Sequence, residues 1–124
     1  MVKASVLLIS MIVVIAVAGM VALAADQDKT TPKHTIKEVM ASAHKAGLFK
    51  KVLAGDASQD EKFALLDYYV SLAENSPNKG SKESWAEKTN AVVLAAAKVA
   101  VGRDGGTMQL KNVANCSACH NAHR

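Results

Sequence analysis

The sequence predicts an all-α protein, an antiparallel four-helix bundle, on three observations. Alanine occurs 22 times among the 124 residues while aromatic residues make up 4%, a composition that suits closely packed helices better than a sheet. No stretch alternates apolar and polar residues with the period of two that strands require. Four segments instead carry apolar residues at helical spacing, and helices joined by short loops pack most simply up-down-up-down.

Residues 1–25 have the organisation of a secretory signal peptide. Lys3 supplies a positive charge, residues 6–21 are almost wholly apolar, and Ala-Leu-Ala at 22–24 matches the A-x-A cleavage pattern. The apolar run is long, so an uncleaved membrane anchor is the alternative. In either case we expect an exported chain, soluble or N-terminally anchored, in an oxidising compartment such as a periplasm.

Residues 26–34 are polar, and we expect them to form a flexible arm, with a solvated His34, before a helical domain over 35–124. A first helix is predicted from Thr35 to Leu53, with Gly55 ending it. Its inward stripe consists of Ile36, Met40, Ala43 and Gly47, flanked by Val39, Leu48 and Val52.

Three further helices follow. The second runs from the S-x-x-E capping box at 58–61 to about Glu74, the third from Ser81 to Val101, and the fourth from Thr107 to the C-terminus. The residues expected to face inward are Phe63, Leu66, Tyr69, Val70 and Ala73 in the second helix, Trp85, Val92, Ala95, Ala96 and Val99 in the third, and Leu110 and Val113 in the fourth. So many alanines leave little apolar area to bury, and we expect another group to complete the core.

The strongest chemical motif is Cys116-Ser-Ala-Cys119-His120, since C-x-x-C-H is the attachment signature of c-type haem. On a helix this spacing puts both thiols on one face, where each can form a thioether with a haem vinyl group, and the imidazole projects from the same face to the iron. The motif therefore predicts one covalently bound haem c.

Three other uses of these residues remain open. An oxidising compartment permits a structural disulfide between the two cysteines. A thioredoxin-like redox pair would need a βαβ context. A zinc ion could take the two thiols, His123 and one remote histidine.

The chain resembles the class II c-type cytochromes, namely cytochrome c′ and its low-spin, methionine-ligated relatives. Residues 116–124 fit that family's C-x-x-C-H-x-x-aromatic-Arg pattern, with His123 where Phe or Tyr is usual. Glu-Ser-Trp at 83–85 resembles the opening of the family's third helix, and residues 37–40 resemble the part of its first helix that faces the distal side of the haem.

This resemblance implies roles for individual residues. His120 is expected to bind the iron through Nε2, and Met40 is the leading candidate for the sixth ligand. His44, one helical turn from Met40, is the second candidate, and iron without a protein sixth ligand is the third reading. Arg124 is expected on the proximal side or at a haem propionate, and His123 is expected at the surface.

The sequence thus favours a periplasmic one-electron carrier. No acid–base pair or nucleophile constellation accompanies the haem motif, which argues against an enzyme. The alternative is a five-coordinate cytochrome c′ type that binds NO or CO, and a less favoured one is a cytochrome subunit of a larger redox complex.

A formal charge of +4 permits acidic redox partners, but no basic run with interleaved aromatics indicates nucleic-acid binding. A homodimer remains possible on the resemblance.

Overall fold

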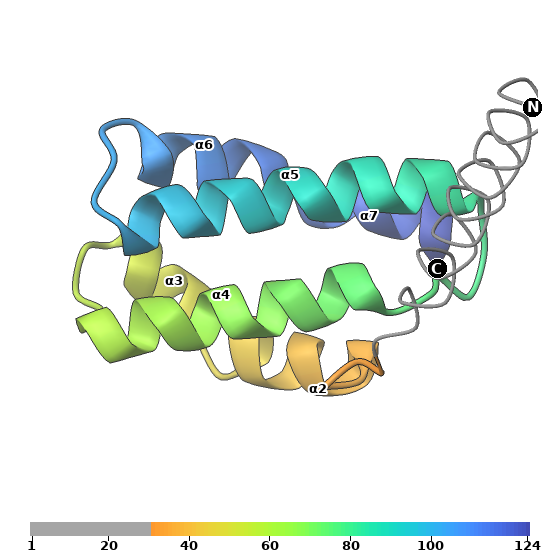
Figure 1. The fold of residues 1–124 in the computed structure, drawn as a ribbon, viewed down its shortest axis with the longest axis horizontal. Coiled ribbons are helices and arrows are strands. Elements are labelled where there is room, and N and C mark those ends of the chain that lie inside the picture. The colour runs from red at the N-terminus through yellow and green to blue at the C-terminus, as the bar shows by residue number, and fades with distance from the viewer. Residues whose placement is uncertain (1–30) are drawn as a thin grey trace, which may run out of the picture. The chain divides into compact units, whose positions relative to one another are not determined.

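The computed structural model describes residues 31–124, and every regular element in this range is a helix (Figure 1). The elements are α2 (Ile36–Val39), η1 (Met40–Lys45), α3 (Leu48–Leu53), α4 (Gln59–Glu74), α5 (Lys82–Ala100), α6 (Gly106–Val113) and α7 (Cys116–His123). The all-α prediction is confirmed for this part of the chain. The expected signal peptide and residues 26–30 of the expected arm lie outside the described residues. Within 31–124, no helix has both the length and the apolar character that a membrane crossing needs.

The two long helices, α4 and α5, form an antiparallel pair, and both begin at the predicted caps (Figure 1). The hydroxyl of Ser58 accepts a hydrogen bond from the Glu61 amide at 3.2 Å, and the hydroxyl of Ser81 accepts one from the Ser84 amide at 3.1 Å. The predicted capping box is only half formed, because the Glu61 carboxylate binds the Lys51 ammonium at 2.8 Å instead.

The inward face of α5 is predicted correctly, whereas that of α4 is predicted only in part. All five residues expected inward on α5 are buried. On α4 Tyr69 is buried as expected, but Phe63 and Val70 are 50% and 37% exposed, and the buried positions are Leu65, Tyr69, Ser71 and Leu72. Phe63 lies two residues from Leu65, roughly 200° around the helix, so the face that covers Leu65 leaves Phe63 outside.

The first expected helix is not continuous. After the short α2, the backbone widens into the π-helical segment η1, in which the Ala46 amide donates to the Ala41 carbonyl five residues back at 2.9 Å. Gly47 then adopts φ +88°, which favours glycine, and starts α3. The predicted stripe is confirmed at Ala43, which is fully buried in the core, and is wrong at Gly47, which forms a turn between η1 and α3.

The fourth expected helix is also divided. Gly105, not Thr107, stands at the N-cap of α6, and the chain leaves the helix at Ala114. α7 then begins with Asn115 as its cap, whose side-chain oxygen accepts a hydrogen bond from the Ser117 amide at 3.0 Å. The C-x-x-C-H motif thus opens a short helix of its own.

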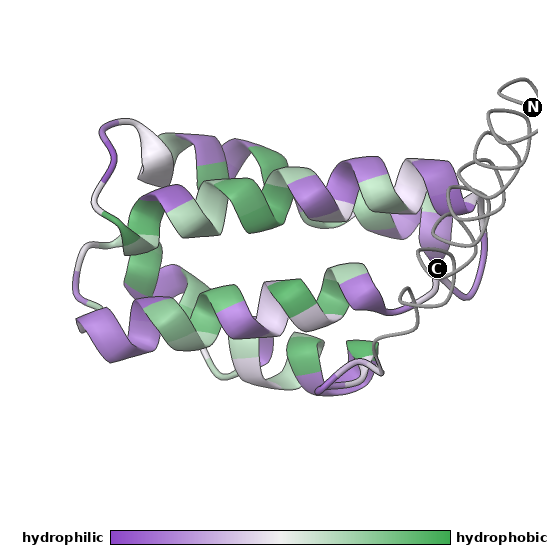
Figure 2. Cartoon of the chain, viewed as in Figure 1, coloured by the Kyte–Doolittle hydropathy of each residue, from purple (hydrophilic) through white to green (hydrophobic). Residues whose placement is uncertain are grey.

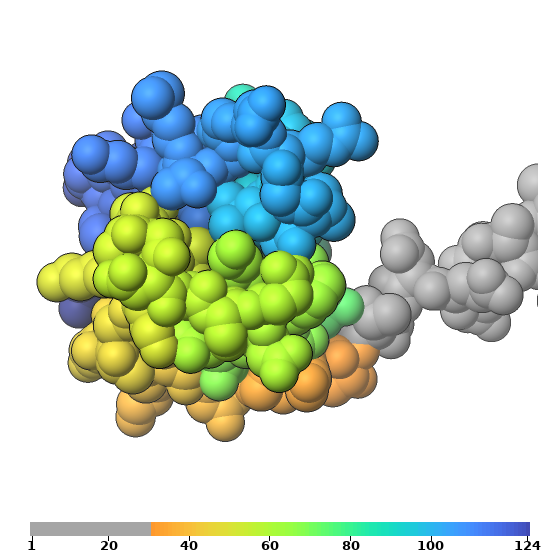
Figure 3. All heavy atoms as spheres, turned by 90° about the vertical axis from the view of Figure 1, so that its left-hand side faces the viewer, coloured from red at the N-terminus to blue at the C-terminus, as the bar shows by residue number. Residues whose placement is uncertain are grey.

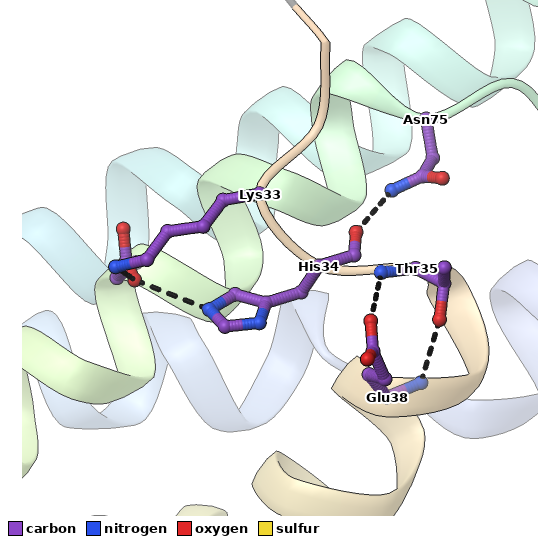
Figure 4. Close-up of polar contacts among 6 residues, drawn as sticks. Lys33, His34, Thr35, Glu38 and Asn75 are labelled. Carbon is purple, nitrogen blue, oxygen red and sulfur yellow. Dashed lines mark hydrogen bonds and ion pairs between the residues drawn. The ribbon is translucent and has the colours of Figure 1, made fainter.

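The end of the expected flexible arm is held against α4 (Figure 4). The Lys33 ammonium lies 2.7 Å from the Asp67 carboxylate, and the Asn75 amide donates to the His34 carbonyl at 2.8 Å. The His34 ring lies over Tyr68, with centroids 4.8 Å apart, and its side chain is only 25% exposed. The expectation of a solvated His34 is therefore wrong, because α4 offers both a carboxylate and an aromatic face.

A capping box that the sequence analysis did not single out begins α2. The Thr35 hydroxyl accepts from the Glu38 amide at 3.2 Å, and the Thr35 amide donates to the Glu38 carboxylate at 2.6 Å (Figure 4). The pattern T-x-x-E at 35–38 was the available signal.

The apolar character of α5 differs between its two ends. Figure 3 shows the end at which the α3–α4 and α5–α6 connections lie side by side, where the Gln59 side chain donates to the Ala100 carbonyl at 2.6 Å. The C-terminal half of α5, toward this end, is the more apolar half (Figure 2). α7 lies toward the other end and contacts α5, whose beginning is its more polar half.

Candidate cofactor site

A cavity of about 490 Å³ opens beside α7, a size typical of sites for small molecules and cofactors. Every helical segment except α3 and α6 contributes to its wall, together with the connections that flank α4 and α7. Its lining residues are Ile36, Lys37, Met40, His44, Lys45, Tyr69, Leu72, Asn78, Trp85, Val92, Ala114, Asn115, Cys116, Cys119, His120, His123 and Arg124. All six residues that the sequence analysis assigned to the haem site are among them.

One wall comes from α7 and carries the motif. Cys116, Cys119 and His120 occupy helical positions i, i+3 and i+4, and all three line the cavity. Both thiols are free, and burial raises the pKa of Cys119, an effect that the Lys88 ammonium partly offsets. Two free thiols and an imidazole on one wall can supply two thioethers and one iron ligand to a single flat group.

Another part of the wall comes from η1 and carries both candidates for the sixth ligand. Met40 and His44 lie four residues apart and line the same cavity. The His44 Nε2 is 3.3 Å from the Tyr69 hydroxyl, and the ring packs against Phe49 with centroids 5.0 Å apart. Burial, and secondly the charge of His120, lower the pKa of His44, so the imidazole is neutral near pH 7 and can accept from the Tyr69 hydroxyl.

Tyr69 and Trp85 supply buried polar groups to the wall. Burial raises the pKa of Tyr69 well above its ordinary value, and the charge of Cys116 adds to this, so the phenol keeps its proton. The indole N–H of Trp85 is buried with no hydrogen-bond partner among the described residues. An unpaired buried donor is costly, by about 1–3 kcal/mol, and beside a cavity it fits a bound group that brings an acceptor.

The charged residues of the lining are all basic. Lys37, Lys45 and Arg124 line the cavity, and no aspartate or glutamate is among the lining residues. The remaining wall is largely apolar, from side chains such as Ile36 and Leu72. Haem combines a flat apolar macrocycle with two carboxylates, so these residues fit a c-type haem in size, polarity and charge.

His123 is buried and not at the surface, contrary to expectation. It is 6% exposed, its Nδ1 donates to the Lys79 carbonyl at 2.8 Å, and its Nε2 lies 3.2 Å from the Ser84 hydroxyl. Its ring meets Trp85 edge-on at 5.3 Å. A histidine can take the place of a buried aromatic here because the α4–α5 connection and α5 satisfy both of its ring nitrogens.

The structure of α7 and its surroundings can be compared with the three other uses of the motif, namely a zinc site, a thioredoxin-like redox pair and a structural disulfide. The zinc set is not assembled, because no three His, Cys, Asp or Glu side chains within residues 31–124 lie close enough to hold a metal ion, and both nitrogens of His123 are engaged. The βαβ context of a thioredoxin-like pair is not present in residues 31–124. The two cysteines are not bonded to each other.

Several lining residues were not assigned to the site from the sequence. Lys45 and Asn78 carry no local signal, because polar residues of this kind usually lie on solvated faces. Lys37 was covered only as part of the segment 37–40 that resembles the distal side of the family's first helix. Tyr69 and Trp85 were expected inward only as packing residues. Their place in the cavity follows from the pairing of α4 with α5 and from the direction of α7.

Comparison with known proteins finds no match: no protein-family model, no curated protein and no solved structure is similar to this chain. The resemblance to class II cytochromes therefore stays a hypothesis, which depends on the motif and on the cavity that surrounds it.

Proposed function

We propose that this chain is an exported c-type cytochrome of the class II kind that carries one electron at a time. The observation that carries the proposal is the cavity, whose lining includes Cys116, Cys119 and His120 of α7 together with Met40 of η1. Met40 is far from the motif in the sequence. A c-type haem needs the two thiols and the imidazole, and a methionine-ligated one also needs a thioether.

In this proposal each residue has one task. Cys116 and Cys119 hold the haem as thioethers, His120 binds the iron through Nε2, and Met40 takes the sixth position. The bound haem supplies an iron that alternates between the ferrous and ferric states. With His120 and Met40 both bound to the iron, no position would be open to a small ligand, and one-electron transfer is the chemistry that the group would supply.

The contacts of His44 favour Met40 as the sixth ligand. The Nε2 of His44 is hydrogen-bonded to Tyr69 and its ring is packed against Phe49, whereas no hydrogen bond from residues 31–124 holds the Met40 thioether. Iron that takes neither residue would give the gas-binding alternative.

The haem also completes the fold that we propose. In the proposed antiparallel four-helix bundle, α2, η1 and α3 together form a kinked first helix, and α4 and α5 are the second and third. The segments α6 and α7 together form the fourth helix. Arg124, at the end of α7, lines the cavity, which supports a role at a haem propionate or on the proximal side.

Lys37 and Lys45 also line the cavity, and their positive charges suit an acidic redox partner in the periplasm.

The test is an absorption spectrum with a mass measurement on the full chain, produced in cells with a working haem-attachment system. We expect one covalent haem that survives denaturation, a low-spin spectrum in both redox states, and no ready binding of CO. Replacing Cys116 or Cys119 with Ala should weaken attachment, whereas Ser117→Ala, within the same motif, should leave it unchanged. A protein of unmodified mass would contradict the proposal, and a high-spin protein that binds CO avidly would favour the gas-binding alternative.

A further inference from the structure

His44 and Met40 compete for one position in the proposed site. Both line the same cavity from the same short segment, η1. The two residues lie about one helical turn apart, roughly 5 Å along the axis, so only one of them can reach a given iron atom. Imidazole is a strong ligand for iron, and a methionine-ligated cytochrome therefore needs something that keeps this histidine away.

The structure contains a group that can do this. The Tyr69 hydroxyl lies 3.3 Å from His44 Nε2, the nitrogen at the tip of the ring that would have to reach a metal. Tyr69 is 1% exposed and is among the largest fully buried side chains, so its hydroxyl has a set position in the core of α4. Phe49 covers the same ring from α3.

We propose that Tyr69 is a positioning residue that holds His44 Nε2 and so reserves the sixth iron position for Met40. The inference rests on the proposed function and adds to it a residue that sets the ligand, and with the ligand the reduction potential. Methionine ligation raises the potential relative to bis-histidine ligation, so Tyr69 acts on the potential without touching the iron.

The test is Tyr69→Phe, which removes the hydroxyl and keeps the ring that fills the core. Loss of one hydrogen bond should shift the ratio of histidine-ligated to methionine-ligated iron by roughly two- to tenfold. We expect the methionine–iron charge-transfer band to weaken, a bis-imidazole low-spin spectrum to grow, and the reduction potential to fall. Tyr68→Phe is the matched control, because it removes a hydroxyl from the neighbouring residue, whose ring contacts His34 instead.

Two double variants separate this role from a merely structural one. In Tyr69→Phe with His44→Ala, no histidine is left to compete, so the methionine band should return. In Met40→Ala the tethered His44 should leave the iron open to CO, and adding Tyr69→Phe should reduce CO binding because His44 then takes the position.

The opposing outcomes are distinct. Unchanged methionine ligation and potential in Tyr69→Phe, or equal CO binding by Met40→Ala with and without Tyr69→Phe, would overturn the role of Tyr69 and leave the proposed function intact. An unmodified protein without covalent haem would overturn the proposed function, and the inference with it.

Discussion

At the scale of single residues, the candidate site depends on side chains whose roles differ from what their type suggests. His123 is a buried packing residue with both nitrogens satisfied, although histidine is often a surface or ligand residue. His44, four residues from Met40, is held by a tyrosine. Two chemically similar histidines thus have different roles, because the contacts of each ring differ: His123 fills a buried position, and His44 is hydrogen-bonded to Tyr69.

Met40→Ala tests the sixth ligand directly. We expect the variant to become high-spin, to bind CO and to have a lower reduction potential, because the thioether stabilises ferrous iron. His44→Ala is the control, since it removes a side chain of comparable bulk from the same segment and should change the spectrum little. If His44→Ala opens the iron and Met40→Ala does not, the ligand assignment is wrong and bis-histidine ligation replaces it.

Gly80→Ala should destabilise the fold more than Gly55→Ala. Both glycines have positive φ, +85° and +80°, a conformation that costs an alanine about 1 kcal/mol. At Gly80 a Cβ would also lie 2.6 Å from His123 Nδ1, whereas at Gly55 nothing lies within 4 Å. Denaturant unfolding of the two variants should therefore show an additional loss at Gly80, and equal losses would mean that the His123 contact is not tight in solution.

At the scale of elements, the two expected helices that carry the candidate haem ligands are the two that are broken. η1 is π-helical and is followed by the Gly47 turn, while α7 is separated from α6 by Ala114 and Asn115. π-Helical turns occur frequently at functional sites because they change which side chains face a given direction. Here the break leaves Ala43 in the core while Met40 and His44 reach the cavity wall.

The capping box of α2 predicts a loss of stability in acid. The amide of Thr35, and then its hydroxyl, hold the pKa of Glu38 below its ordinary value. This pKa is lower in the folded chain than in the unfolded chain. The ionised Glu38 therefore stabilises the fold fully above the unfolded pKa, and this stabilisation is lost as the pH falls through the folded pKa. Unfolding free energies measured against pH should fall less steeply below about pH 4.5 in Glu38→Gln than in the unmodified protein, and parallel curves would contradict this.

At the scale of the whole molecule, the core is small and one end of it is a cavity. Among residues 31–124, twelve buried residues form the hydrophobic cluster, and three of them are alanines, namely Ala43, Ala95 and Ala96. Such a core buries little apolar area, so a bound macrocycle would add a large share of it.

The bundle should therefore depend on its haem for stability. A Cys116→Ser, Cys119→Ser variant isolated without haem should melt at a lower temperature than the loaded protein, or show reduced helicity, because a group that binds only the folded chain stabilises it. Circular dichroism of the two forms measures this. Identical melting curves would be inconsistent with the haem as part of the core.

The lysines that line the cavity, Lys37 and Lys45, should attract anionic electron donors to the haem. Lys37→Glu with Lys45→Glu should slow reduction of the haem by an anionic reagent and weaken its dependence on salt. Lys50→Glu with Lys111→Glu changes the net charge equally at residues that do not line the cavity, and should have a smaller effect. Equal effects of the two pairs in stopped-flow kinetics would show that only the net charge matters.

The sequence by itself determined the helical class, the bounds of α4 and α5, and the C-x-x-C-H motif, because caps, helical periodicity and ligand spacing are local properties. Only the tertiary structure decided where helices break, which face of α4 is buried, and which residues share the cavity. Gly47 could be read as part of a helical stripe until its positive φ was known. The hydrogen bond between Tyr69 and His44 joins α4 to η1, and no local pattern reports such a contact, because it arises only when the two elements pack.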